Sequence, residues 1–231
     1  MLKGKLNLVK TFCIIAVVVV LVVAPYFISR PYVMILRRIL VFAALSLSWL
    51  FFSGVTKYIS LGSVAFVGTG IYFTLLYLYG MHLSKPMFPF LPFPVIVILA
   101  GIICFALALA VGLTSLRLSG IYFAIATFGV GQLVGGIFNW WQSKVRLPYS
   151  ISIPVQYARD FNLQYYSVLT AAFSTFFITT LLLRSKFGLA LRMIGDCEEA
   201  AAHSGVNTTL YKTLGFAISA FFMGLAGGSY T

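Results

Sequence analysis

The stretch from Pro92 to Gly112 reads PFPVIVILAGIICFALALAVG and carries no charged side chain over 21 residues. An α-helix needs about 20 mostly apolar residues to cross the hydrocarbon core of a bilayer. This stretch therefore predicts a transmembrane helix, and six further apolar runs fit the same template. The seven predicted spans are 11–28, 33–52, 58–80, 92–112, 118–138, 165–183 and 210–230.

The composition supports the same fold class. Hydrophobic residues make up 61% of the 231 residues and charged residues only 9%, and the mean hydropathy is +1.03. A soluble domain averages about 25% charged residues, so most of this chain must face lipid or other helices. We predict an all-α, polytopic transmembrane helix bundle, with residues 1–231 forming a single transmembrane domain.

The net charge of +12 does not indicate nucleic-acid binding, because the basic residues lie singly or in pairs at the edges of apolar runs. In those positions they fix the orientation of the helices. The chain has three cysteines, of which Cys13 and Cys104 lie in apolar runs and Cys197 in a polar segment. Their number and spacing indicate neither a disulfide framework nor a metal site.

The distribution of basic residues favours a cytoplasmic N-terminus in the inner membrane. The run 11–28 follows three lysines, and we interpret it as a first transmembrane helix rather than a cleaved signal, because further apolar runs follow at once. Basic residues predicted inside are Lys3, Lys5, Lys10, Lys57, Arg117, Arg184, Lys186, Arg192 and Lys212. Those predicted outside are Arg30, Lys85, Lys144, Arg146 and Arg159, with Arg37 and Arg38 just within the second span.

The polar segment 184–209 holds three of the four acidic residues of the chain and is predicted to lie in the cytoplasm. Leu189, Met193 and Cys197 recur at helical spacing, with polar residues on another face. Arg192 and Asp196 stand four residues apart, so their side chains can meet. This pattern predicts one short amphipathic helix with its polar face turned away from the bundle.

Within this segment, Glu199-Ala200-Ala201 followed by Gly205 has the E-A-A-x-x-x-G form that resembles the permeases of ABC importers. The usual I-x-L-P ending is missing. In that family the segment is a coupling helix that docks into a groove of a cytoplasmic ATPase. The residues that the resemblance implies in coupling are Gly188, Arg192, Asp196, Glu199, Ala200, Ala201 and Gly205.

Three further blocks, in the same order, resemble the permeases of branched-chain amino acid ABC transporters, the LivM/LivH-like family. They are Ser60–Tyr72, Leu116–Thr127 and Arg184–Arg192, and the resemblance continues from Lys212 through Gly228. It implies transport of branched-chain amino acids or similar small polar solutes such as urea and short amides. It also implies paired cytoplasmic ATPases, a second homologous permease and an extracytoplasmic solute-binding protein, which would deliver solute at residues 139–164.

The chain departs from this family in two places. The outer connection reads Trp140-Trp141-Gln142-Ser143-Lys144 where relatives carry a Thr-Gly-Gly-rich turn. The chain also stops at Thr231, where relatives continue through further helices, so we expect C-terminal helices to be missing and this product alone to be inactive in transport.

Two other function classes remain as alternatives. An ion-coupled secondary transporter usually carries carboxylates inside its helices, whereas Asp160, Asp196, Glu198 and Glu199 all lie in the polar connections. An enzyme is disfavoured because His82 and His203 are predicted on opposite sides of the membrane. The sequence has no Walker-type phosphate loop, so no catalytic residue and no cofactor is predicted, and ATP would be bound by the partner subunit.

Small and aromatic residues suggest where a solute crosses. Gly131-x-x-x-Gly135 and Ala220-x-x-x-Gly224-x-x-x-Gly228 have the spacing that lets helix backbones approach closely. They predict packing within one subunit, or alternatively a pore lining or a subunit interface. The pathway candidates in the third and fifth predicted spans are Gly62, Gly68, Gly70, Tyr72 and Tyr122.

Overall fold

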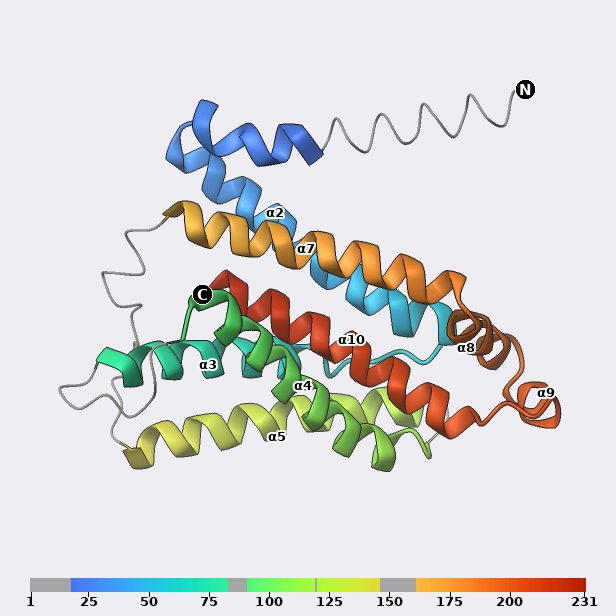
Figure 1. Ribbon diagram of the computed structural model, residues 1–231. Coiled ribbons are helices and arrows are strands. Elements are labelled where there is room, and N and C mark those ends of the chain that lie inside the picture. The colour runs from blue at the N-terminus through green and yellow to red at the C-terminus, as the bar shows by residue number, and fades with distance from the viewer. Residues whose placement is uncertain (1–17, 83–90, 119, 146–160) are drawn as a thin grey trace, which may run out of the picture.

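The computed structural model describes residues 18–82, 91–118, 120–145 and 161–231 (Figure 1), and all regular structure within them is helical. The elements are α2 (Arg30–Trp49), η1 (Leu50–Gly54), α3 (Ser63–His82), α4 (Phe93–Ser115), α5 (Ile121–Val145), α7 (Phe161–Arg184), α8 (Lys186–Asp196), α9 (Glu198–His203) and α10 (Thr208–Tyr230). A shorter apolar helix, Val18–Phe27, precedes α2.

Six helices of the described residues are long and apolar enough to cross a membrane. They are Arg30–Gly54, Ser63–Gly80, Phe93–Ser115, Ile121–Lys144, Asn162–Arg184 and Thr208–Tyr230. The predicted polytopic helix bundle is therefore confirmed. The remaining predicted span, 11–28 at the N-terminus, lies partly outside the described residues. Its described part contains the helix Val18–Phe27.

Two boundaries differ from the prediction. The third span was expected from residue 58, but α3 begins at Ser63, because residues 57–62 are held in a non-helical loop by bonds to other elements. Trp49 Nε1 donates to the Ser60 carbonyl at 3.0 Å and Leu61 N donates to Thr127 Oγ1 at 3.1 Å. The fifth span was expected to end near residue 138, but α5 continues through Val145, so part of the predicted 139–164 connection is helical.

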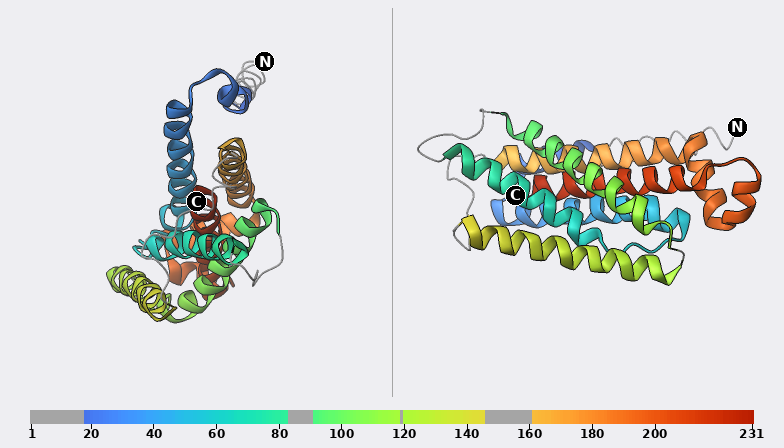
Figure 2. Two further views of the ribbon diagram at one scale, coloured as in Figure 1. Left: turned by 90° about the vertical axis from the view of Figure 1, so that its left-hand side faces the viewer. Right: turned by 90° about the horizontal axis from the view of Figure 1, so that it is seen from below.

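The helix α10 is the centre of the bundle. Of the residues in its most apolar stretch, 67% are buried, against 22% for the corresponding stretch of α5. The helix packs against α2, α3, α4, α7 and α8. Figure 2 shows it enclosed by these helices, with α5 at the edge. The Ala220–Gly224–Gly228 stripe is thus confirmed as packing within the subunit, since a Cβ on Gly224 would meet Cys104 of α4.

Close backbone contact between α3 and α10 depends on glycine at Gly70. A Cβ at this position would collide with the carbonyl of Gly224. The neighbouring Gly68 lies on another face of α3, where an added Cβ would have nothing within 4 Å. Lipid supplies no hydrophobic drive for helix association, so such close van der Waals packing is a main source of stability.

We therefore expect opposite effects from the same substitution at these two glycines. Gly70→Ala should lower the thermal unfolding midpoint in detergent, because α3 and α10 must move apart. Gly68→Ala should leave the midpoint unchanged or raise it, since alanine is favoured over glycine within a helix by up to about 1 kcal/mol. Equal destabilisation by both variants would contradict the close α3–α10 contact.

Candidate functional site

One end of the bundle gathers the ends of α2, α4 and α7 and the beginnings of α3, α5 and α10, together with α8 and α9 (Figure 1). We call it the α8–α9 end. The described basic residues that the sequence assigned to the inner side lie in or next to the connections at this end. They are Lys57, Arg117, Arg184, Lys186, Arg192 and Lys212.

The helix α8 is held against the bundle by a face that the sequence pattern misplaced. Its buried residues include Gly188, Leu191 and Ile194, whereas Leu189, predicted on the apolar face, is 59% exposed. Gly188 lies so close to α7 that a Cβ there would collide with the backbone of Leu183. The helix packs through the face that carries Gly188, and the apolar side chain of Leu189 is left on the exposed face.

The predicted single amphipathic helix is in fact two helices. Cys197 is extended (φ −156°, ψ 109°) and separates α8 from α9. Asp196 pairs with Lys57 at 3.1 Å rather than with Arg192, and both side chains of this bridge are largely exposed. Gly205 follows α9 with φ +83°, a conformation that L-residues other than glycine rarely adopt.

The other predicted coupling residues divide between surface and interior. Arg192, Glu199 and Ala200 are exposed, whereas Ala201 is buried. The exposed set, with Leu189, projects from the α8–α9 end.

The acid that anchors α9 is Glu198, which the sequence analysis did not select. Its Oε1 lies 2.5 Å from Lys212 Nζ of α10, and its Oε2 accepts a hydrogen bond from the Tyr58 hydroxyl at 2.5 Å. Lys212 Nζ also lies 3.3 Å from the Tyr58 hydroxyl, 3.4 Å from the Leu116 carbonyl and 4.7 Å from the centre of the Tyr58 ring. We call Tyr58, Glu198 and Lys212 the Glu198 cluster.

Burial within this cluster is unequal. The Lys212 side chain is 5% exposed and that of Glu198 is 35% exposed. A sequence signal was available, because Lys212 is the one charged residue in the mostly apolar stretch 208–230. Such a residue is expected to have a partner, but the hydropathy pattern does not say which one.

The protonation states in the cluster follow from its contacts. Burial raises the pKa of Glu198, but the hydrogen bonds from Lys212 and Tyr58 outweigh it, so its pKa lies below that of an ordinary glutamate. Burial and the Glu198 carboxylate raise the pKa of Tyr58. At neutral pH the carboxylate is charged and the phenol donates. The lowered pKa means that this stabilisation is complete at neutral pH and is lost as pH falls through the folded-state pKa.

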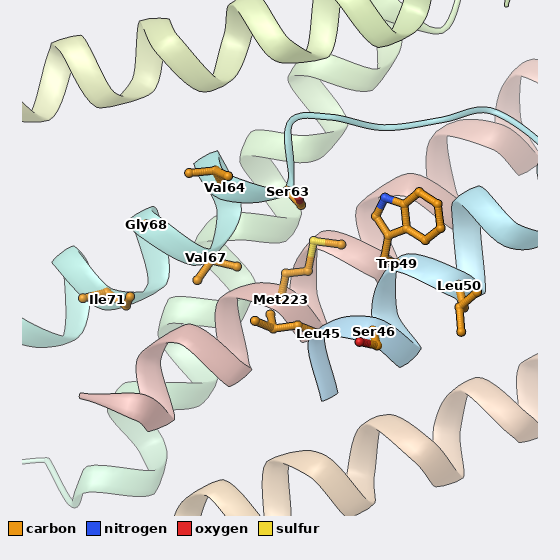
Figure 3. A pocket seen from close by; sticks show the side chains of 10 residues that line it. All are labelled: Leu45, Ser46, Trp49, Leu50, Ser63, Val64, Val67, Gly68, Ile71 and Met223. Carbon is orange, nitrogen blue, oxygen red and sulfur yellow. The ribbon is translucent and has the colours of Figure 1, made fainter. Parts of the chain in front are cut away.

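A second feature is an open-sided pocket of about 700 Å³ between α2, η1, α3 and α10 (Figure 3), which we call the cavity. None of its lining side chains is charged, and most are apolar. The lining residues are Leu45, Ser46, Trp49, Leu50, Ser63, Val64, Val67, Gly68, Ile71 and Met223.

Of the five pathway candidates, only Gly68 lines this cavity. Gly62 lies against the Thr127 carbonyl of α5, and Gly70 lies against α10. Tyr72 stacks on Phe138 with ring centres 4.6 Å apart, and Tyr122 is 68% exposed on α5. Trp49 and Met223, which the sequence analysis did not select, are on the cavity wall.

Comparison with known proteins identifies the family. The family described as "Branched-chain amino acid transport system / permease component" matches residues 32–231, which include nearly all of α2 and every later element through α10. The chain belongs to this family. It is a family of transport permeases, and the resemblance seen in the sequence blocks is confirmed.

One curated relative of this permease is the guanosine ABC transporter permease protein NupQ of Bacillus subtilis (strain 168). It is 33% identical over 87 residues, which are 38% of this chain and 27% of the relative. The aligned part therefore spans about a quarter of the relative's length. No solved structure matches the chain.

Unequal burial in the Glu198 cluster predicts unequal effects of neutralising its two charges. Glu198→Gln leaves a buried ammonium without its carboxylate and should lower the free energy of unfolding by up to about 3 kcal/mol, the low end for a buried pair. Lys212→Met leaves a partly exposed carboxylate that water can solvate, and should cost less.

Chemical denaturation of the purified permease in detergent, followed by circular dichroism, would measure the loss of unfolding free energy in each variant. The double variant should resemble Lys212→Met. Lys57→Gln, which removes only the exposed bridge to Asp196, is the control and should cost under about 1 kcal/mol. Equal losses from Glu198→Gln and Lys57→Gln would show that the cluster does not anchor α9.

Proposed function

We propose that this chain is the membrane-spanning subunit of an ABC importer, located in the cytoplasmic membrane with a cytoplasmic N-terminus. The observation that carries the proposal is the α8–α9 segment, which is anchored on the bundle through Glu198 and presents exposed side chains at the end richest in basic residues. The positive-inside tendency favours placing that end in the cytoplasm.

The exposed surface of α8 and α9 has the chemistry of a docking site. Leu189 is a large apolar side chain that is 59% exposed, and Arg192 and Glu199 lie exposed nearby in the same two helices. An apolar contact flanked by opposite charges gives both affinity and orientation to a protein partner. The partner proposed is a cytoplasmic ATPase, which binds and hydrolyses ATP, while this chain binds no cofactor of its own.

The solute proposed is a small organic molecule delivered by an extracytoplasmic binding protein. The family description supports branched-chain amino acids, and the relative's name supports a nucleoside. The cavity favours an uncharged solute, because its lining offers serine hydroxyls, an indole ring and apolar side chains but no charge to pair with a zwitterion. The predicted delivery site, residues 139–164, lies largely outside the described residues.

A second, homologous permease subunit is proposed to pack on α5. Gly129, Gly131 and Gly135 have nothing within 4 Å of a virtual Cβ in the described structure, so these glycines do not serve packing within this part of the chain. Gln132 lies exposed near the middle of α5. An amide facing hydrocarbon without a partner is costly, whereas a second helix packed on these glycines could hydrogen-bond it.

The α5 proposal predicts a cross-link. With the second subunit taken as another copy of this chain, Gly135→Cys in a Cys13→Ser, Cys197→Ser background should form an oxidant-dependent disulfide dimer in membranes, because the glycine face brings the two copies together. Val134→Cys, on the buried side of the same helix, should stay monomeric on a non-reducing gel. Dimers from both variants, or from neither, would contradict an α5 interface between two copies.

The docking proposal predicts loss of the ATPase from variants of the exposed surface. Glu199→Lys and Leu189→Glu should each reduce co-purification of the ATPase at least tenfold, about 1.4 kcal/mol, without changing membrane insertion. Arg117→Glu is the matched control, because it reverses an exposed charge at the same end but outside α8 and α9.

Labelling of Cys197 would show on which side of the membrane the α8–α9 end lies. Cys197 is exposed, whereas Cys104 is buried. A membrane-impermeant maleimide should reach Cys197 only from the cytoplasmic side, and bound ATPase should block it. Labelling from outside intact cells would invert the orientation and remove the docking proposal.

A further inference from the structure

We propose that the Glu198 cluster is the joint that transmits movement of the docked α8–α9 segment to the wall of the cavity. Tyr58, Glu198 and Lys212 would then be positioning residues for energy coupling. This inference rests on the proposed function, since it requires an ATPase that moves α8 and α9.

The first step concerns where α9 is attached. The extended residue Cys197 interrupts the helix between α8 and α9, so α9 is not a rigid continuation of α8. On the far side of this interruption, Glu198 binds Lys212 of α10 and Tyr58 of the 57–62 loop. Among the described residues, the other ion pair between the segment and the bundle is Lys57–Asp196, which is exposed and stabilises little.

The second step concerns why the cluster holds while the segment moves. Lys212 is almost fully buried, so separating it from Glu198 would leave an uncompensated charge, a costly change. Moving Lys212 together with Glu198 keeps the pair intact. A displacement of α9 is therefore expected to carry the beginning of α10 with it.

The third step follows α10 from Lys212 to the cavity. Met223 lines the cavity and lies 11 residues after Lys212 on the same helix, a rise of about 16 Å. Between these two residues, Phe216 packs in an aromatic group with Phe52 and Phe123. A continuous, buried helix over this distance transmits a shift or rotation with little loss.

A parallel route runs through Tyr58. Its loop is bonded to the cavity wall, because Trp49 Nε1 donates to the Ser60 carbonyl at 3.0 Å and Trp49 lines the cavity. The Tyr58 ring also packs edge-on against Phe123 with centres 5.6 Å apart. Both partners of Glu198 thus lead to residues on one cavity, Met223 by the helix and Trp49 by the loop.

The test uses a thiol at the cavity as the probe, so that it does not depend on the identity of the solute. Met223→Cys is placed in a Cys13→Ser, Cys197→Ser background, and the permease is reconstituted with its ATPase. The rate of maleimide labelling at position 223 is measured with and without ATP plus vanadate. Met223 is 3% exposed, so labelling should be slow without ATP, and we expect the rate to rise with ATP plus vanadate as the cavity wall moves.

The deciding variants separate the two routes. Lys212→Met removes the ion pair that carries α10 and should reduce the ATP-dependent change in labelling rate at least fivefold. Tyr58→Phe keeps the ring and loses only the hydroxyl bonded to Glu198, so it should reduce that change measurably but by less, while leaving ATPase co-purification unchanged. Lys57→Gln, at the exposed bridge, should leave the change at its original size.

The outcomes separate this inference from the proposed function. An ATPase that fails to bind the parent protein would remove the proposed function itself. A bound ATPase whose ATP leaves the labelling rate at position 223 unchanged would overturn the inference alone. The same holds if Tyr58→Phe retains the full ATP-dependent change.

Discussion

The architecture depends on the close approach of α10 to its neighbours. Because lipid is as apolar as the side chains, helices in a membrane associate through packing and polar contacts rather than through the hydrophobic effect. Here glycines Gly70, Gly224 and Gly227 bring the backbones of α3, α4 and α10 into contact. That contact buries α10 and fixes Lys212, which the same helix carries at its other end. The position of α9 follows from the position of that lysine.

The positions of the spans could be predicted from sequence because hydropathy reports directly on the environment of each helix. A run such as 92–112 is long and apolar enough to cross a bilayer, and the structure has a helix, α4, over the same residues to within a few positions. The errors fall where bonds between distant elements decide the backbone. Helix α3 begins later than predicted because Trp49 and Thr127 hold the preceding loop, and the hydropathy of the loop itself contains no trace of either bond.

The α8–α9 segment shows a different kind of error. Its composition and its motif were sufficient to locate the segment, and the further sequence blocks indicated the family, but periodicity gave the wrong buried face. A glycine scores as neutral in such a pattern, whereas Gly188 decides how α8 sits against α7. The motif likewise indicated the exposed Glu199 as the coupling residue and did not include its neighbour Glu198. Choosing between adjacent glutamates requires knowing which one reaches Lys212, and that depends on the fold.

The distribution of charge is consistent with energy entering at one end of the molecule. The six membrane-spanning helices contain no Asp or Glu, so none of them carries a carboxylate that could exchange a proton or bind sodium at mid-membrane. The acids of the described residues, Asp196, Glu198 and Glu199, all lie in α8 and α9. Two of them are exposed, and the third is bonded to the central helix. In the proposed coupling, a segment that combines an exposed charged surface with a buried ionic attachment would receive force from the partner ATPase. The cavity that would respond to this force has no charged side chain in its lining.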